Sequence, residues 1–193
     1  MSIALSMTLA PEQLEALAHA RRQGRKITRA ANVATFSGWS MAFFAFITLV
    51  SGLFSLVALL LGIGLTVVAC IELRGAKRMR LLDDTAPRML GFNQIGLGVL
   101  VIVYCSWGVW QAVFGPSPYE SYLAQGGKVA DLIEPIDNLN RAVMSIFYAG
   151  LLVLSAIAQG CTAVYYFSRR RLMVKYLQET PDWIVQTIQT VAA

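Results

Sequence analysis

Four long apolar runs dominate this sequence and restrict what the chain can fold into. They occupy residues 31–50, 53–73, 89–114 and 142–167. Each is close to or longer than the roughly 20 residues that an α-helix needs to cross the hydrocarbon core of a bilayer. A lipid-exposed segment satisfies its backbone hydrogen bonds internally only as a helix, and these runs lack the alternation of barrel strands. The sequence therefore predicts an all-α membrane protein with four transmembrane helices.

The composition agrees with this class of protein. Of the 193 residues, 56% are hydrophobic and only 14% are charged, which is too apolar for an ordinary soluble domain. The net charge of +5 would also suit a nucleic-acid binder. However, the basic residues gather beside the apolar runs, as topology signals do. We therefore expect a lipid bilayer with anionic lipids at its cytoplasmic face as the partner, and no nucleic acid.

Basic clusters give the expected orientation. They precede the first run, separate the second from the third and follow the fourth; their members are Arg21, Arg22, Arg25, Lys26, Arg29, Arg74, Lys77, Arg78, Arg80, Arg88, Arg169, Arg170, Arg171 and Lys175. Such clusters mark the cytoplasmic side of a membrane. The other two connections are an uncharged turn around Ser51 and Gly52 and a mostly acidic segment. We expect both termini in the cytoplasm, in the inner membrane if the cell is bacterial, and two helical hairpins.

The expected organisation has three parts. Residues 1–30 form a cytoplasmic amphipathic segment, residues 31–167 form the transmembrane bundle, and residues 168–193 form a second cytoplasmic amphipathic segment. Within the bundle, residues 74–88 form the cytoplasmic hairpin and residues 115–141 form the external loop. The acids that precede the first run argue against a secretory signal or a mitochondrial transit peptide.

Residues typical of helix starts support these divisions. Pro11 begins an amphipathic N-terminal helix, Thr85 with Pro87 begins the third span, and Pro135 is expected to begin the fourth. Pro181 opens a C-terminal helix with apolar residues on one side, Trp183, Ile184, Ile188 and Val191, and with Gln186 and Gln189 turned to water. Helical spacing in the external loop predicts a short amphipathic cap over the bundle, formed by Val129, Leu132, Ile133 and Ile136.

Small residues recur every seven positions in all four spans. The series are Ala31, Gly38, Ala45 and Gly52; Ser55, Gly62, Ala69 and Ala76; Gly91, Gly98, Cys105 and Ala112; and Ala142, Ala149, Ala156 and Ala163. Small residues let membrane helices approach closely, and a period of seven selects a left-handed supercoil. This predicts a left-handed four-helix bundle, although small residues are common in any membrane helix. The pattern leaves open whether the stripes face one another or a second protomer.

Five polar residues lie within the spans, near the expected cytoplasmic side: Asn32, Glu72, Asn93, Gln94 and Gln159. They are candidates for a polar chamber that holds a cation, passes a proton or binds a small ligand, because intramembrane ionisable groups are costly. The favoured interpretation is structural. In it, Glu72 pairs with Arg29, Arg74 or Arg88, while the amides hydrogen-bond between helices and fix their register.

The sequence gives no reason to expect an enzyme, a metal or a cofactor. His19 is the sole histidine and precedes the first span, the cysteines form no CxxC pair, and the external loop has no nucleophile–base pair. A group of Tyr104, Trp107, Trp110 and Gln111 suits an aromatic belt better than a lipid or quinone site. We expect a non-enzymatic protein that acts through helix association with itself or a larger membrane complex. The alternative is a small transporter or channel around Glu72, Asn93 and Gln94.

Overall fold

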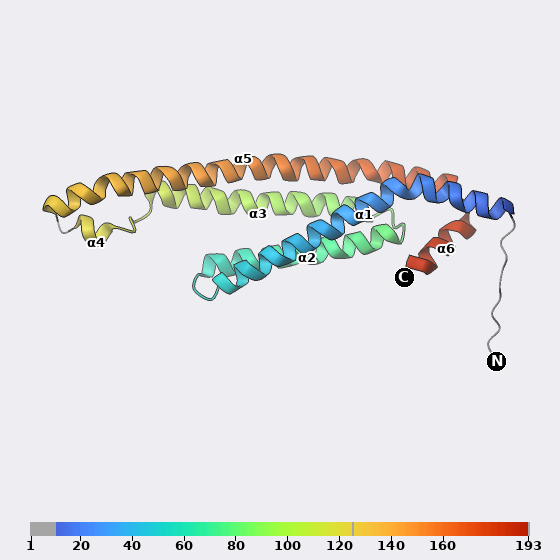
Figure 1. Cartoon of the computed structure of the whole chain (residues 1–193), viewed down its shortest axis with the longest axis horizontal. Helices are drawn as coiled ribbons and strands as arrows, with labels where there is room; N and C mark the ends of the chain where they lie inside the picture. Colours follow the sequence, from blue (N-terminus) through green and yellow to red (C-terminus); the bar gives the residue numbers. More distant parts are fainter. Residues whose placement is uncertain (1–10, 125, 193) are drawn as a thin grey trace.

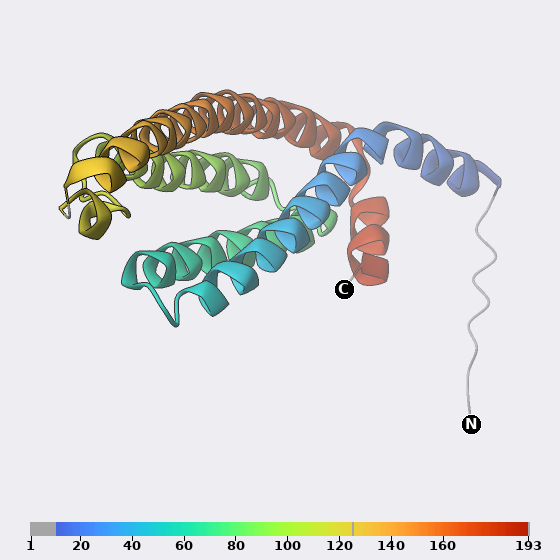
Figure 2. The same cartoon turned by 60° about the vertical axis from the view of Figure 1, so that its left-hand side comes forward.

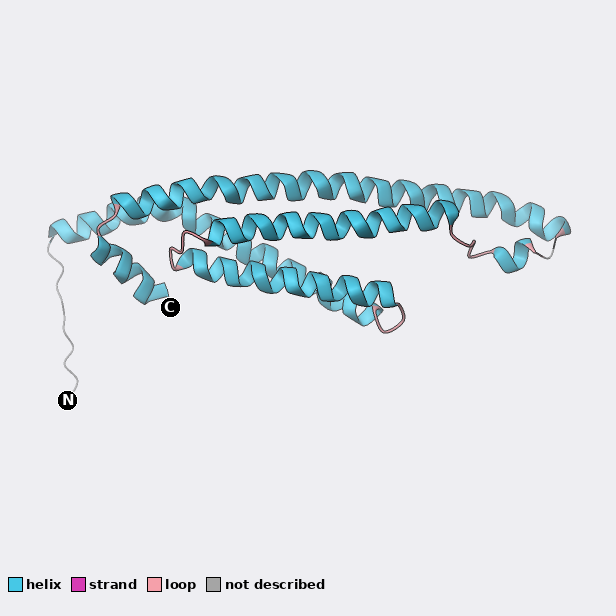
Figure 3. Cartoon of the chain, turned by 180° about the vertical axis from the view of Figure 1, so that it is seen from behind, coloured by secondary structure: helices cyan, strands magenta, loops and turns pink. Residues whose placement is uncertain are grey.

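The computed structural model describes residues 11–124 and 126–192, and this part of the chain is helical with no strand (Figure 3). The first ten residues of the expected N-terminal segment lie outside the described residues. In order, the helices are α1 (Pro11–Ser51), α2 (Leu56–Arg80), α3 (Ala86–Phe114), α4 (Glu120–Leu123), α5 (Gly127–Glu179) and α6 (Asp182–Ala192). Four of them, α1, α2, α3 and α5, are long and apolar enough to cross a membrane, so the helices expected at the four apolar runs are present.

The long helices form two pairs. α1 lies along α2, and α3 lies along α5, while α2 and α3 make the main contact between the pairs (Figure 1). The pairs meet at the end that holds the α2–α3 connection and separate toward the other end (Figure 2). We call the meeting end the basic end, because all three basic clusters lie there. The prediction of a compact left-handed bundle is not confirmed by this open arrangement.

The core of the protein lies at the basic end, where α1, α2, α3, α5 and α6 come together. Its members include Ile27, Ala30, Ala34, Met79, Leu90, Tyr166, Met173 and Tyr176. Leu82 joins α2 to α3 with a φ of 59°, a conformation that is rare for leucine, and its side chain is buried in this core. Burial of Leu82 therefore holds a tight and strained connection between the two helix pairs.

Between the separated ends of the pairs lies an apolar cavity of about 290 Å³. Its lining comes from the outer parts of α2 and α3: Val57, Leu60, Leu61, Leu100, Val103, Tyr104 and Trp107. Trp107 stacks on Trp110, with ring centroids 5.2 Å apart, and both residues are about half exposed. The other two members of the aromatic group predicted from the sequence, Tyr104 and Gln111, are half-buried.

Several helix boundaries differ from the predictions. Pro135 does not begin a helix but lies inside α5, which starts at Gly127; this residue and Gly126 before it both have positive φ. The expected cap on the bundle is instead the first part of α5, which continues the line of the span (Figure 1). The amphipathic start of the chain is likewise continuous with the first span in α1. α3 begins at Ala86 as Thr85 and Pro87 predict.

α6 is the predicted C-terminal helix, but it packs differently from the prediction. Ile184 is buried, Ile188 packs on the core at the basic end, and Gln189 donates a hydrogen bond of 3.0 Å to the carbonyl of Leu81. Gln189 is therefore not turned to water. α6 folds back on the α2–α3 connection, and only part of its apolar side, including Val191, is left exposed.

Candidate functional site

The side chain of Glu72 is the centre of the candidate site. Glu72 lies on the same face of α2 as Ala69, Ala76 and Met79, so the helical period turns it inward with these buried residues. Its exposed fraction is 0%. A carboxyl group at this position requires internal partners, because burial of an unpaired polar group costs about 1–3 kcal/mol or more.

Partners reach the Glu72 carboxyl group from α3 and α5. From α3, Asn93 donates to Oε2 at 2.8 Å and Gln94 donates to Oε1 at 3.1 Å. From α5, the hydroxyl of Tyr166 donates to Oε1 at 2.8 Å. One side chain of the α1–α2 pair thus bonds to both helices of the other pair, and we call Glu72 with Asn93, Gln94 and Tyr166 the Glu72 clamp.

The amide of Asn93 also ties the two helix pairs through the backbone. Its Nδ2 donates to the carbonyl of Val68 at 3.1 Å, in addition to the bond with Glu72. Asn93 and Gln94 are 7% and 2% exposed, so water has little access to them. The clamp lies where α2 meets α3, and it therefore fixes the register between the pairs.

The donors to Glu72 are all neutral. The expected pairing with Arg29, Arg74 or Arg88 is wrong, because the ion pairs within the described residues join Arg141 to Asp137 and Lys175 to Glu179. These three arginines are exposed, because long and strongly polar side chains extend toward water and away from the helix interior. The amides hydrogen-bond between helices as the structural interpretation expected.

Two of the five predicted polar residues lie outside the clamp. Asn32 is exposed and accepts a hydrogen bond of 3.4 Å from Arg80, which also donates to Thr35 at 2.9 Å. Gln159 is half-buried on α5 beside Gly98 of α3. Instead, the clamp includes Tyr166, which was not among the predicted polar residues. The available signal was helical spacing, since Tyr166 shares a face of α5 with the buried Ala163 and Met173.

Most of the predicted packing residues lie in helix contacts. Gly38, Ala45, Gly62, Ala69, Gly91, Gly98 and Cys105 are all buried. A Cβ atom at Gly38 would lie 2.8 Å from Leu73, and one at Gly62 would lie 2.9 Å from Leu49, so α1 and α2 approach closely through these glycines. Ala149 and Ala156 are exposed, so the stripe on α5 does not mark its contact with α3.

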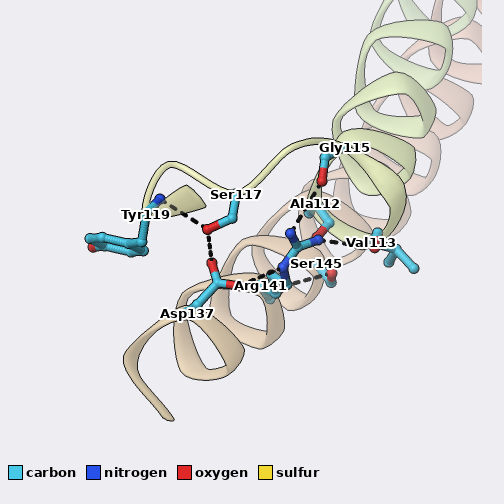
Figure 4. A network of polar contacts seen from close by, with 8 residues as sticks. All are labelled: Ala112, Val113, Gly115, Ser117, Tyr119, Asp137, Arg141 and Ser145. Atoms are coloured by element: carbon cyan, nitrogen blue, oxygen red, sulfur yellow. Dashed lines mark hydrogen bonds and ion pairs between the residues drawn. The ribbon is translucent and has the colours of Figure 1, made fainter. Parts of the chain in front are cut away.

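A second polar network closes the opposite end of the α3–α5 pair (Figure 4). Arg141 of α5 donates to the carbonyls of Ala112, Val113 and Gly115 at 3.1–3.3 Å. These carbonyls belong to the C-terminal end of α3, where helices leave carbonyl groups without intrahelical donors and where positive charge is stabilising. Arg141 therefore acts as a C-terminal cap for α3, supplied by a neighbouring helix.

Asp137 holds this arginine in place. Its Oδ2 accepts from Arg141 Nε at 2.9 Å, and its Oδ1 accepts from the Ser117 hydroxyl at 2.6 Å. The hydrogen bond from Ser117, followed by that from Arg141, holds the pKa of the Asp137 carboxyl group below its usual value. Ser117 in turn accepts from the backbone N–H of Tyr119. This network accounts for the ordered turn between α3 and α4.

Residues that bind a metal ion usually occur as clusters of His, Cys, Asp and Glu. The described residues contain no group of three or more such side chains that could hold a metal ion. No family model, no curated protein and no solved structure matches the chain. The geometry of the clamp and the helix surfaces therefore carries the functional argument.

Proposed function

We propose that this chain is a non-enzymatic integral membrane protein that acts through helix–helix association, with itself or within a larger membrane complex. The proposal starts from the four helices that are long and apolar enough to insert in a membrane. The observation that carries it is the Glu72 clamp. The polar groups in the spans are used to hold the helices of the chain together, and the outward helix faces are left for other partners.

The enclosure of the clamp favours a structural role over a solute site. Cavities of about 380 and 490 Å³ lie near the two ends of the molecule, and neither is lined by Glu72, Asn93 or Gln94. A transport site needs access from at least one side of the membrane. The carboxyl group instead has donors on both oxygens and 0% exposure.

The helix surfaces also suit association. Of the most apolar stretch of α5, only 6% is buried within the chain, and the corresponding value for α2 is 22%. Lipid covers such faces without a hydrophobic cost, but membrane helices also associate through close packing of complementary faces. Among the four candidate spans, α5 therefore buries the smallest share of its most apolar stretch.

Transport of a proton or cation is the second candidate function. The observation that favours it is the set of neutral donors around Glu72, because a buried carboxyl group without a basic partner is a suitable carrier of a proton. Movement of the two helix pairs about the basic end would be needed to open the clamp to water.

One experiment separates the two functions. The full-length protein is purified in mild detergent, the proteins that co-purify are identified, and the oligomeric state is measured. The same preparation is then reconstituted in liposomes for proton and cation flux. We expect a stable complex, with itself or another membrane protein, and no flux above that of empty liposomes. A monomer that supports flux, with the flux lost in Glu72→Gln, would contradict the association function.

A further inference from the structure

α5 carries a second heptad pattern that the contact with α3 does not use. Starting from Val129, apolar residues and glycines alternate at spacings of three and four residues along the helix. The members are Val129, Leu132, Ile136, Leu139, Val143, Ile146, Gly150, Val153, Ile157, Gly160 and Val164. All of them are exposed, and a Cβ atom at Gly150 or Gly160 would meet nothing within 4 Å. We call this set the outward seam.

The outward seam lies opposite the face that packs on α3. In a heptad frame with Val129 at position a, the seam occupies positions a and d. The residues toward α3, such as Arg141, Tyr148 and Gln159, occupy positions c and f. Positions c and f are on the far side of a helix from a and d. α5 therefore has two separate apolar faces, and only one is covered by this chain.

Lipid can cover the part of the seam inside the membrane, but not the part outside it. At 1.5 Å per residue, the 53 residues of α5 span about 80 Å, far more than a hydrocarbon core of about 30 Å. The first part of α5 contains Asp131, Glu134, Asp137 and Arg141, which place it in water. In this part, Leu132 and Leu139 are 72% and 65% exposed. Regularly spaced, exposed apolar residues on one face of a helix in water indicate a surface that a partner covers.

The residue types select the partner. Outside the membrane the a positions are β-branched, Val129 and Ile136, and the d positions are leucine, Leu132 and Leu139. β-Branched residues at a with leucine at d favour parallel two-stranded coiled coils. A second copy has the same orientation in the membrane, so its α5 would lie parallel and in register about a two-fold axis.

Charge and size on the flanks of the seam fit the same partner. Asp131, Glu134, Asp137 and Arg141 occupy positions c, f, b and f, which point away from the seam. Inside the membrane, Ala142, Ala149 and Ala156 occupy position g beside the seam, where small side chains permit close approach. The exposed alanine stripe thus adjoins the outward seam and not the α3 contact.

We propose that the outward seam of α5 is the interface of a parallel homodimer, a coiled coil that begins outside the membrane and continues through it. The proposal rests on the association function given above and names its surface and its partner. Because the phase of the pattern does not break between water and lipid, a single partner helix covers the whole seam. The sustained period of seven residues gives the pair a left-handed supercoil.

Disulfide cross-linking of the full-length protein in native membranes tests the proposal. The native cysteines are first replaced by alanine, and single cysteines are then placed at Ile136 or Leu139 on the seam. The matched controls are Glu134→Cys and Asn138→Cys, which are exposed on the other side of the same turns. Under mild oxidation we expect covalent dimers at both seam positions, at least tenfold more than at the controls.

A second variant tests the dimer without a cross-link. The double substitution Leu132→Glu and Leu139→Glu should convert a dimer in mild detergent to a monomer. The monomer should still be folded, with a thermal unfolding midpoint within a few degrees of that of the control variant Glu134→Gln. Equal cross-linking at seam and control positions would contradict the outward seam as the dimer interface. A double variant that remains dimeric would also contradict it. Adducts with a different protein at the seam cysteines would contradict the homodimer but agree with the association function. Absence of any complex would contradict both the homodimer and the association function.

Discussion

Tyr166 donates a hydrogen bond of 2.8 Å to Glu72, although 94 residues separate them in the sequence. Both side chains are fully buried, and they come from helices that belong to different pairs. The bond therefore connects the α1–α2 pair to the α3–α5 pair directly. Because the pairs separate toward the other end, the loss of such a bond should affect the whole arrangement and not one helix.

Removal of the Tyr166 hydroxyl tests the clamp with little change in shape. We expect Tyr166→Phe to lower the free energy of unfolding by about 1–3 kcal/mol, because a buried acceptor loses a donor while the ring still fills its space. Thermal unfolding in detergent gives the measurement. Tyr165→Phe, on the adjacent half-buried residue, is the control and should change the midpoint little. Equal effects of the two substitutions would contradict the clamp.

Substitutions at Glu72 distinguish an anchor from a proton carrier. Glu72→Gln should fold nearly as well as wild type, because the amide of Gln94 can turn to present an oxygen to the new amide group while Asn93 keeps its bond to Val68. Glu72→Leu should be less stable than Glu72→Gln by about 2 kcal/mol or more, because it leaves several buried donors without an acceptor. Thermal unfolding of both variants gives the comparison. Equal stability of Gln and Leu variants would argue against the anchor.

Gly62 tests the close approach of α1 and α2. A side chain there would meet both the side chain and the backbone nitrogen of Leu49, at 2.9 and 3.0 Å from its Cβ atom, so a rotamer change cannot relieve the clash. We expect Gly62→Leu to cost about 1–3 kcal/mol or more and to reduce the folded yield. Gly96→Leu is the matched control, because a Cβ atom at Gly96 meets nothing within 4 Å. Similar yields of the two variants would remove the packing argument.

The Asp137 network predicts a dependence on pH. The pKa of Asp137 is lowered in the folded protein, first by Ser117 and then by Arg141. A lowered pKa means that the group stabilises the fold above its unfolded pKa, near 3.8, and that this stabilisation is lost as the pH falls through the lower folded pKa. At neutral pH, Asp137→Asn should therefore have a lower free energy of unfolding than wild type. Below about pH 4 the wild type should lose this advantage, because the variant has no carboxyl group to protonate at position 137. Unfolding between pH 7 and pH 3 gives the test, and parallel curves for the two proteins would contradict it.

Labelling tests the proposed orientation in the membrane. In a background without native cysteines, single cysteines at Ser121 and Ser168 lie in exposed positions toward opposite ends of the molecule. With cytoplasmic termini, an impermeant thiol reagent added to intact cells should label position 121 and leave position 168 unlabelled until the membrane is opened. Labelling of position 168 alone would reverse the orientation.

The sequence by itself determined the local structure of this protein. The four apolar runs predict helices because a bilayer offers no other way to satisfy the backbone, and all four are present. The starts of α3 and α6 follow from Thr85 with Pro87 and from Pro181, since these residues act within one turn. Pro135 misled the prediction, because the glycines before it and the helical spacing of the outer segment already begin α5 at Gly127.

Only the tertiary structure decided the partners of the polar residues and the arrangement of the helices. The basic residues near Glu72 in the sequence suggested an ion pair, but the helical period turns Glu72 toward Ala69 and Ala76 and turns the arginines toward water. Its actual partners, Asn93, Gln94 and Tyr166, come from the α3–α5 pair. Periodicity indicates which face of a helix is covered, but lipid and protein cover apolar faces equally well. The separation of the two pairs therefore depends on side-chain contacts between helices, which no local pattern specifies.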